Sequence, residues 1–254
     1  DAEGRPTDIA LRRKTDATRL VEEAMILANE TVAGYLVRRG FPCLYRVHEP
    51  PASDALGSLI PVFQEFDWFE KPMEARLVAG DPKVIQEILA ASAPRSEGEL
   101  VSSLLLRAMK RADYRPENQG HYGLASEAYC HFTSPIRRYP DLMVHRLLKD
   151  SHAMETHLQW LAKHSSKMER LAERAERDSV ELKLCEYLAE RIGEVFTGTI
   201  STVVARGLYV RLENTLEGFV RFDYLHGEYH EFDPLAQTLV GEETGRTYRI
   251  GQQL

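Results

Sequence analysis

The sequence predicts an α+β protein in which a helix-rich region, residues 1–192, precedes a small all-β barrel, residues 193–254. Apolar residues in much of the first region recur at three- and four-residue intervals, as they do on one face of a helix. Beyond Gly193, β-branched and aromatic residues alternate in short runs that glycines separate, which is typical of short strands. The 254 residues suffice for two such domains.

Residues 16–39 predict the first helix, which Asp16 can cap and which Gly40 and Pro42 end. Its apolar residues fall on both sides, so we expect the helix to be well buried. Glu22 and Glu23 interrupt the apolar run. From the pattern alone they are an exposed carboxylate pair near a helix N-terminus, where the dipole favours negative charge.

The remaining elements of the helical region follow in order. A short extended segment precedes helices, and a polar glycine-bearing loop then leads to the segment 131–146. Helices dominate from Asp141 to Arg191, with a break near His164 after which Ser165 or Ser166 caps the next helix. The expected ranges before that loop are 41–51 (extended) and 55–70, 81–90 (opened by Asp81 and Pro82) and 97–112 (helical).

Charge and cysteine content narrow the class of function. The net charge of −7 argues against an indiscriminate nucleic-acid binder. Residues 131–149 nevertheless hold four basic side chains and one acidic one, which fits either a local polyanion site or a solvated helix face. Three cysteines without CxxC spacing indicate free thiols in a reducing compartment, and no apolar run is long enough for a membrane helix. We therefore expect a cytoplasmic protein with no membrane partner.

The segment HFTSPIRRYPDLMVHR, residues 131–146, carries the strongest chemical signal. Arg137 and Arg138 offer planar guanidinium groups that suit phosphate. Thr133 and Ser134 add hydroxyls and backbone N–H groups ahead of a Ser-Pro helix start. A purely structural interpretation competes, in which Ser134 caps a helix and both arginines pair with Asp141.

This segment closely resembles the motif of the RNB family of 3′→5′ exoribonucleases, which includes ribonucleases II and R. The resemblance implies processive, metal-assisted hydrolysis of single-stranded RNA to nucleoside 5′-monophosphates, with Mg²⁺ as cofactor. It makes Arg137 the catalytic residue that stabilises the scissile phosphate, and Arg138 a structural or backbone-contacting neighbour. RNA contacts are expected from Thr133, Ser134, His131, Glu23 (with Glu22 as the competing choice) and Glu176, whose alternative is an ion pair on a solvated helix.

The C-terminal region resembles the S1-type OB-fold RNA-binding domain. That resemblance places Arg206, Tyr209 and Arg221 on the RNA-facing surface, where many relatives carry an aromatic residue first and a histidine third. Arginines here should make binding more electrostatic and more sensitive to salt. Phe219 is expected in the core.

The family's metal ligands are aspartates spaced as D-x(5)-D-x-D-D, and no such cluster occurs in residues 1–254. We therefore expect a fragment whose magnesium ligands lie outside this sequence and whose barrel is incomplete at its C-terminus. Such a fragment would be inactive alone. The alternative is a non-catalytic RNA-binding or regulatory module on the same scaffold.

Overall fold

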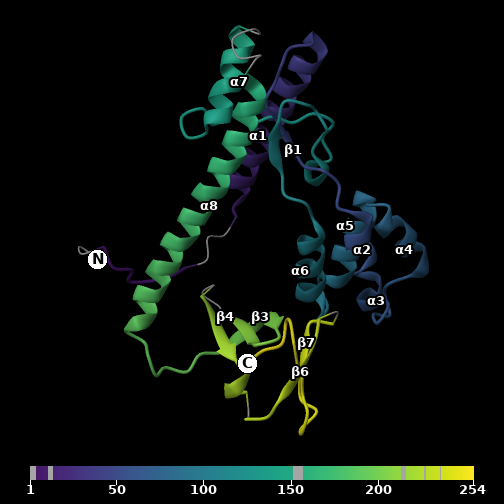
Figure 1. Ribbon diagram of the computed structural model, residues 1–254, viewed down its shortest axis with the longest axis vertical. Coiled ribbons are helices and arrows are strands. Elements are labelled where there is room, and N and C mark those ends of the chain that lie inside the picture. The colour runs from purple at the N-terminus through teal and green to yellow at the C-terminus, as the bar shows by residue number, and fades with distance from the viewer. Residues whose placement is uncertain (1–3, 11–13, 151–156, 213–215, 226, 235) are drawn as a thin grey trace. The chain divides into compact units, whose positions relative to one another are not determined.

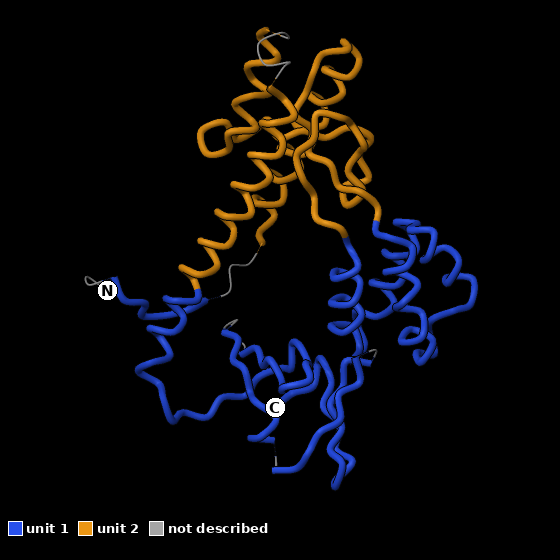
Figure 2. The backbone as a smooth tube through the Cα atoms, viewed as in Figure 1, with its two compact units in different colours: residues 1–11, 51–109, 181–254 blue, residues 12–50, 110–180 orange. Residues whose placement is uncertain are grey.

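A computed structural model of the chain describes residues 4–10, 14–150, 157–212, 216–225, 227–234 and 236–254. The chain divides into two compact units (Figure 2). The motif unit, orange in the figure, comprises residues 12–50 and 110–180, and the barrel unit, blue in the figure, comprises residues 1–11, 51–109 and 181–254. The α+β class is confirmed, because helices precede a region of small antiparallel sheets (Figure 1).

The motif unit consists of helices around one two-stranded antiparallel sheet, in which β1 pairs with β2 and Arg46 lies opposite Tyr114. Its buried core brings together Leu36 of α1, Leu44 and Val144. The elements are α1 (Asp16–Arg39), β1 (Tyr45–Val47), β2 (Asp113–Arg115), the 3-10 helix η1 (Tyr122–Leu124), α7 (Tyr139–Lys149) and the N-terminal part of α8 (Leu158–Ala189).

The helix predicted at residues 16–39 is confirmed as α1, but the prediction that Asp16 caps it is wrong. Thr15 is the cap: its hydroxyl accepts a hydrogen bond from the Thr18 N–H at 3.2 Å, and the Thr18 hydroxyl accepts one from the Thr15 N–H at 2.8 Å. This reciprocal pair satisfies two backbone donors at once. Gly40 ends the helix with φ of +64°, a conformation that suits glycine.

The expectation that α1 is well buried is also wrong. Its buried residues are Asn29, Ala33 and Leu36, all in the C-terminal half. Leu20 is 71% exposed and Leu27 66% exposed, so the N-terminal half lies largely open in this structure. The core of the motif unit lies against the C-terminal half of the helix, which is why the burial is one-sided along its length.

The predicted break near His164 does not occur, because α8 runs without interruption from Leu158 to Ala189. Ser165 and Ser166 are buried within it. The Ser166 hydroxyl accepts a hydrogen bond from the backbone N–H of Tyr114 at 2.9 Å. The serine therefore supplies a tertiary partner to β2 rather than a cap.

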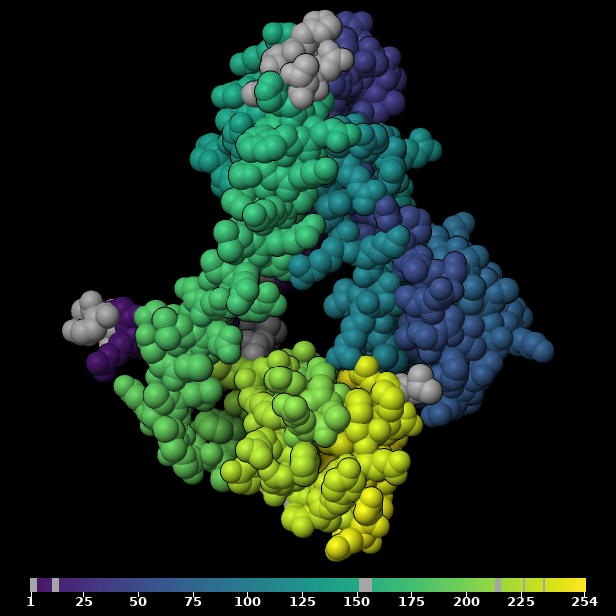
Figure 3. All heavy atoms as spheres, in the orientation of Figure 1, coloured from purple at the N-terminus to yellow at the C-terminus, as the bar shows by residue number. Residues whose placement is uncertain are grey.

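Side chains along α8 are largely solvent-exposed, and Figure 3 shows this helix in green at the molecular surface. Leu171 is 59% exposed and Leu182 60% exposed, so these apolar side chains of the helix do not form a buried seam here. Within the described part of the chain, no helix has the length and apolar character required to cross a membrane.

Two of the cysteines, although far apart in sequence, share the core of the motif unit. Cys43 and Cys130 are both fully buried, whereas Cys185 is exposed, and all three are free thiols. A hydrogen bond between the two cysteines, followed by burial, raises the pKa of the Cys43 thiol well above its usual value. The Cys43 thiol is therefore a poor nucleophile in the folded protein.

In the barrel unit, the prediction of one helix over residues 55–70 is wrong. Two short helices, α2 (Ser53–Gly57) and α3 (Ile60–Phe63), occupy the range. Pro61 lies in the first turn of α3, and a proline there cannot continue a preceding helix because it lacks an N–H and clashes with the carbonyl four residues back.

The other helices of this unit agree more closely with their predicted ranges. α5 begins after Asp81, whose carboxylate accepts a hydrogen bond from the Lys83 N–H at 2.9 Å, as the Asp-Pro opening predicted. The helix predicted over 97–112 ends earlier, and the chain then enters β2. The bounds are α4 (Lys71–Val78), α5 (Pro82–Ser92) and α6 (Gly98–Ala108).

The C-terminal region forms two three-stranded antiparallel sheets, in the orders β3-β4-β5 and β6-β7-β8. Backbone bonds also join β3 to the end of the chain, with the Gly198 N–H donating to the Leu254 carbonyl at 2.9 Å. Gly207 starts β4 with φ of +148°, and a Cβ there would clash with the Val220 carbonyl. The bounds are β3 (Gly198–Val204), β4 (Gly207–Leu212), β5 (Glu217–Arg221), η3 (Phe222–Tyr224), β6 (His230–Asp233), β7 (Thr238–Gly241) and β8 (Thr247–Arg249).

Candidate nucleic-acid interface

The arginine segment forms a tight turn ahead of α7 rather than the start of a helix at Ser134 and Pro135. The Ser134 carbonyl accepts hydrogen bonds from the N–H groups of Arg137 at 3.3 Å and Arg138 at 3.0 Å. The helix begins at Tyr139, with Pro140 in its first turn. We call residues 133–138 the arginine turn.

Asp141 fastens the arginine turn to α7. Its side chain has no exposed surface, and Oδ1 accepts hydrogen bonds from the Ser134 N–H at 2.7 Å and from Nη2 of Arg138 at 2.8 Å. The prediction that Ser134 caps the helix is therefore wrong. A carboxylate inside the helix instead accepts a hydrogen bond from the backbone N–H of Ser134. The predicted pairing of Asp141 with arginine is confirmed for Arg138.

Asn29 holds the other end of the turn from α1. It is 2% exposed, and its Nδ2 donates to the Tyr129 hydroxyl at 2.9 Å. Its Oδ1 accepts hydrogen bonds from the N–H groups of Phe132 at 2.9 Å and Thr133 at 3.3 Å. One buried amide thus satisfies two backbone donors of the arginine segment, which buried N–H groups require.

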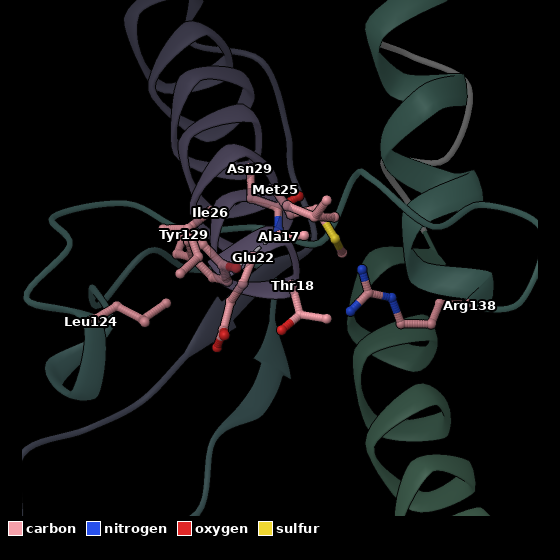
Figure 4. A pocket seen from close by; sticks show the side chains of 10 residues that line it. Ala17, Thr18, Glu22, Met25, Ile26, Asn29, Leu124, Tyr129 and Arg138 are labelled. Atoms are coloured by element: carbon pink, nitrogen blue, oxygen red, sulfur yellow. Dashed lines mark hydrogen bonds between the residues drawn. The ribbon is translucent and has the colours of Figure 1, made fainter. Parts of the chain in front are cut away.

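A cavity of about 620 Å³ opens between α1 and the arginine turn. Figure 4 shows the Arg138 guanidinium facing side chains that α1 carries, among them Glu22 and Thr18. The wall combines apolar side chains with a phenol, an amide, a carboxylate and a guanidinium. The lining residues are Ala17, Thr18, Val21, Glu22, Met25, Ile26, Asn29, Leu124, Tyr129 and Arg138.

The structure separates the two adjacent glutamates of α1. Glu22 lines the cavity and pairs with Lys14 at 2.8 Å, in an exposed ion pair. Glu23 is exposed and is not among the lining residues. Neighbours on a helix point about 100° apart, which accounts for this division.

The two arginines have different environments. Arg138 lines the cavity and is held by Asp141. Arg137 is exposed, and its guanidinium forms no ion pair or hydrogen bond with any residue that the structure describes. It therefore keeps all its donors available for a ligand.

His131 and Thr133 lie partly buried beside the turn. His131 Nδ1 lies 2.8 Å from the hydroxyl of Tyr114, and burial, followed by the charge of Arg138, lowers the pKa of His131 to about 3. The hydroxyl oxygen of Thr133 is buried without a hydrogen-bond partner among the described residues. An unsatisfied hydroxyl of this kind is costly in a folded protein.

Glu176 lies exposed on the part of α8 that belongs to the motif unit. The ion pairs that competed for it are absent within the described ranges. Glu173 pairs with Arg111, and Lys183 pairs with Glu186. Glu176 itself has no described partner, so its carboxylate is free to contact a ligand.

The remaining predicted residues lie on the sheet β3-β4-β5 of the barrel unit. Arg206 lies exposed in the turn between β3 and β4, and Arg221 pairs with Asp223. Tyr209 lies opposite Phe219 across the strands, with ring centroids 4.9 Å apart. Phe219 is 44% exposed, so the expectation that it belongs to the core is wrong, and the two rings form an open aromatic surface.

The side chains of the described residues that could bind a metal ion are not grouped into a metal centre. No group of three or more histidine, cysteine, aspartate or glutamate side chains is arranged to hold a metal ion in the described part of the chain. Asp141 is the buried carboxylate of the site: its Oδ1 bonds to Ser134 and Arg138, and its Oδ2 is buried without a hydrogen-bond partner among the described residues.

Two residues of the site, Asn29 and Tyr114, were not found by sequence reasoning. Asn29 offered the clearest signal, because an asparagine amid the apolar residues of a helix requires buried partners. Tyr114 offered none, since its role depends on a tertiary contact with His131.

The chain matches two family models. Residues 1–153 match the model described as RNB domain, and residues 190–254 match the model described as S1 RNA binding domain. Among curated proteins, ribonuclease R of Aquifex aeolicus is 43% identical over all of this chain and 37% of its own length. Ribonuclease R of Escherichia coli is 38% identical over all of the chain and 33% of its own length.

Among solved structures, the chain is similar to Mycoplasma genitalium RNase R in complex with ribose methylated single-stranded RNA, with a TM-score of 0.85 and 28% identity. That similarity covers all of this chain and 41% of the other. The chain thus spans about a third to two fifths of the length of these relatives.

Proposed function

Because the chain belongs to the RNB family of exoribonucleases, we propose that it is part of a processive 3′→5′ exoribonuclease of the ribonuclease R type. The substrate is single-stranded RNA and the products are nucleoside 5′-monophosphates. The chain supplies the cation that stabilises the scissile phosphate, one wall of the RNA site and an RNA-binding barrel. We propose that residues 1–192 belong to the exoribonuclease domain and that residues 193–254 form the RNA-binding barrel.

The observation that carries this proposal is the state of Arg137. Its guanidinium is exposed and unpaired, while the turn that bears it is fastened by Asp141 on one side and Asn29 on the other. A preorganised, uncompensated cation is what a developing negative charge on phosphorus requires. Arg138 is paired with Asp141, so it supports the arginine turn and also lines the cavity.

The cavity between α1 and the turn suits a terminal nucleotide. Val21, Met25 and Ile26 offer an apolar wall for a base. Glu22 offers a carboxylate that can accept hydrogen bonds from ribose hydroxyls. We therefore assign the terminal-nucleotide contact to Glu22 in place of Glu23.

Thr133 and Ser134 contact RNA through their hydroxyls. The Thr133 N–H is bonded to Asn29 and the Ser134 N–H to Asp141, so neither backbone donor is free for phosphate. Their hydroxyls, and those of the ribose, can each donate and accept. Glu176 supplies a further contact from α8.

The chemistry also requires a divalent cation, which the family uses. The described residues do not provide its ligands, and we place them in a part of the protein outside this chain. A cytoplasmic location, consistent with three free thiols, belongs to the same proposal.

The test of the nuclease is mononucleotide release from a 3′-labelled single-stranded RNA in the presence of Mg²⁺. We expect release by the longer protein that contains this chain and an upstream segment bearing the clustered aspartates. We expect none from residues 1–254 alone. If the longer protein bound RNA but released no mononucleotide, the non-catalytic RNA-binding module would replace the enzyme.

The aromatic surface of the barrel leads to a separate prediction. Tyr209→Ala is expected to weaken binding of single-stranded RNA roughly tenfold, because stacking on an aromatic ring contributes about 1–3 kcal/mol per base. Fluorescence anisotropy over a salt titration measures it. The matched control is Tyr229→Ala, since Tyr229 is 64% exposed and has no ring contact with a described residue. Equal affinities of the two variants would remove Tyr209 from the interface.

A further inference from the structure

Tyr114 and His131 form a hydrogen-bonded pair at the edge of the arginine turn. The Tyr114 hydroxyl lies 2.8 Å from His131 Nδ1, and the two rings meet edge to face with centroids 5.6 Å apart. Tyr114 is 4% exposed. His131 belongs to the segment 131–146, but no sequence pattern assigns a role to its pairing with Tyr114.

The hydrogen-bond partners of Tyr114 indicate which nitrogen of His131 carries the proton. Burial, the largest cause, raises the pKa of Tyr114 above its usual value, so the phenol keeps its proton. Its hydroxyl has no other hydrogen-bond partner among the described residues. The phenol therefore donates to Nδ1, and a neutral imidazole then carries its proton on Nε2. Nε2 is not bonded to a described residue and is not among the buried atoms that lack a partner, so it is not fully buried.

The surroundings of His131 keep the ring uncharged. Burial comes first, and the charges of Arg138 and Arg46, the ring of His121 and the charge of Arg137 act in the same direction. The pKa of His131 falls to about 3. A group with this pKa is a poor proton shuttle near neutral pH, but it is a constant N–H donor.

Tyr114 is itself held by two contacts, one from α8 and one from β1. Its backbone N–H donates to the Ser166 hydroxyl at 2.9 Å, and the guanidinium carbon of Arg46 lies 4.8 Å from its ring centroid. Arg46 in turn pairs with Glu169 at 2.6 Å. The phenol is therefore preorganised by α8 and β1, rather than free to follow the imidazole.

His131 adjoins the candidate site. Its ring centroid lies 5.8 Å from that of Tyr129, which lines the cavity. We propose that Tyr114 is a positioning residue that holds His131 as a neutral N–H donor, with Nε2–H directed to an oxygen of the RNA sugar-phosphate backbone next to the arginine turn. The identity of the ligand in this inference rests on the proposed function. The tautomer and charge of the His131 imidazole do not depend on it.

The first test concerns the imidazole and uses no RNA. In the full chain labelled with ¹⁵N-histidine, long-range ¹H–¹⁵N correlations should show one tautomer of His131, protonated at Nε2, that persists from pH 8 to pH 5. The His131 signals are assigned by their loss in His131→Gln. In Tyr114→Phe the ring should exchange between tautomers and titrate at higher pH. A single unchanged tautomer in Tyr114→Phe would overturn the positioning role.

The second test concerns the ligand. Tyr114→Phe is expected to weaken binding of a single-stranded oligoadenylate about three- to tenfold, the effect of one misplaced hydrogen bond. Tyr45→Phe is the matched control: Tyr45 lies on the neighbouring strand, is 6% exposed, and its hydroxyl has no described partner. It should bind like the wild type.

A second pair of variants keeps the inference testable if Tyr114→Phe does not fold. His131→Gln retains an N–H donor and should bind better than His131→Ala, whereas equal affinities would overturn the donor role. Failure of the wild-type chain to bind RNA would contradict the proposed function. Wild-type binding that Tyr114→Phe leaves unchanged would contradict this inference alone.

Discussion

Arg137→Ala is expected to lower the rate of mononucleotide release by the longer, active protein about 10²–10³-fold, the usual effect of removing one preorganised charge stabiliser from an active site. The loss should appear in kcat, because a cation that acts on the developing charge contributes in the transition state more than in the ground state. Single-turnover release from an end-labelled oligonucleotide measures it directly.

The structure explains why this substitution separates catalysis from folding. Arg137 is exposed and makes no side-chain bond with a described residue, so its removal leaves the turn intact. Arg138→Ala differs, because it leaves the buried carboxylate of Asp141 without its cation and should destabilise the motif unit. The control is Arg38→Ala, since Arg38 is an exposed arginine in the last turn of α1. Near-wild-type turnover of Arg137→Ala would withdraw the role assigned to this residue.

Asn29→Ala is expected to lower the free energy of unfolding by about 2–4 kcal/mol, because it leaves buried donors without a partner. The substitution removes the acceptor for the Phe132 and Thr133 N–H groups and the donor to Tyr129. Urea denaturation followed by circular dichroism measures the loss, and RNA binding should weaken in parallel because the arginine turn loses one anchor.

Two comparisons make the Asn29 prediction specific. Asn118→Ala removes an asparagine that also bonds backbone, to Gly120 and Glu127, but in an exposed loop, so it should cost less than about 1 kcal/mol. Asn29→Asp keeps an acceptor for the two N–H groups and should be less harmful to the turn than Asn29→Ala. A loss no larger in Asn29→Ala than in Asn118→Ala would contradict the anchoring role.

Local patterns predicted those parts of the fold that local interactions determine. The helix at 16–39, the Asp81 cap of α5 and the change to strands after Gly193 follow from spacing, capping chemistry and β-propensity. The continuity of α8 could not be predicted in this way. Two adjacent serines have the chemistry of a cap, and only a tertiary contact with the Tyr114 N–H shows that Ser166 is used otherwise.

The residues of the candidate site fall into the same two groups: those that local patterns predict and those that depend on tertiary contacts. The arginine segment and its family resemblance nominated Arg137, and pairing of Arg138 with Asp141 was among the alternatives. Which of Glu22 and Glu23 lines the cavity depends on the rotation of α1 about its axis, which one-sided burial fixes and sequence does not. The roles of Asn29 and Tyr114 depend on partners 103 and 17 residues away, respectively.

The bond between Asn29 and Phe132 also bears on the order of folding. It joins residues separated by 103 positions, and closing so long a loop is entropically costly until other contacts have brought its ends together. Local bonds to Ser134 and Asp141 can shape the arginine turn early, but its anchor to Asn29 forms only when α1 docks. A chain whose helices have formed but not yet assembled therefore carries the motif without one of its two supports.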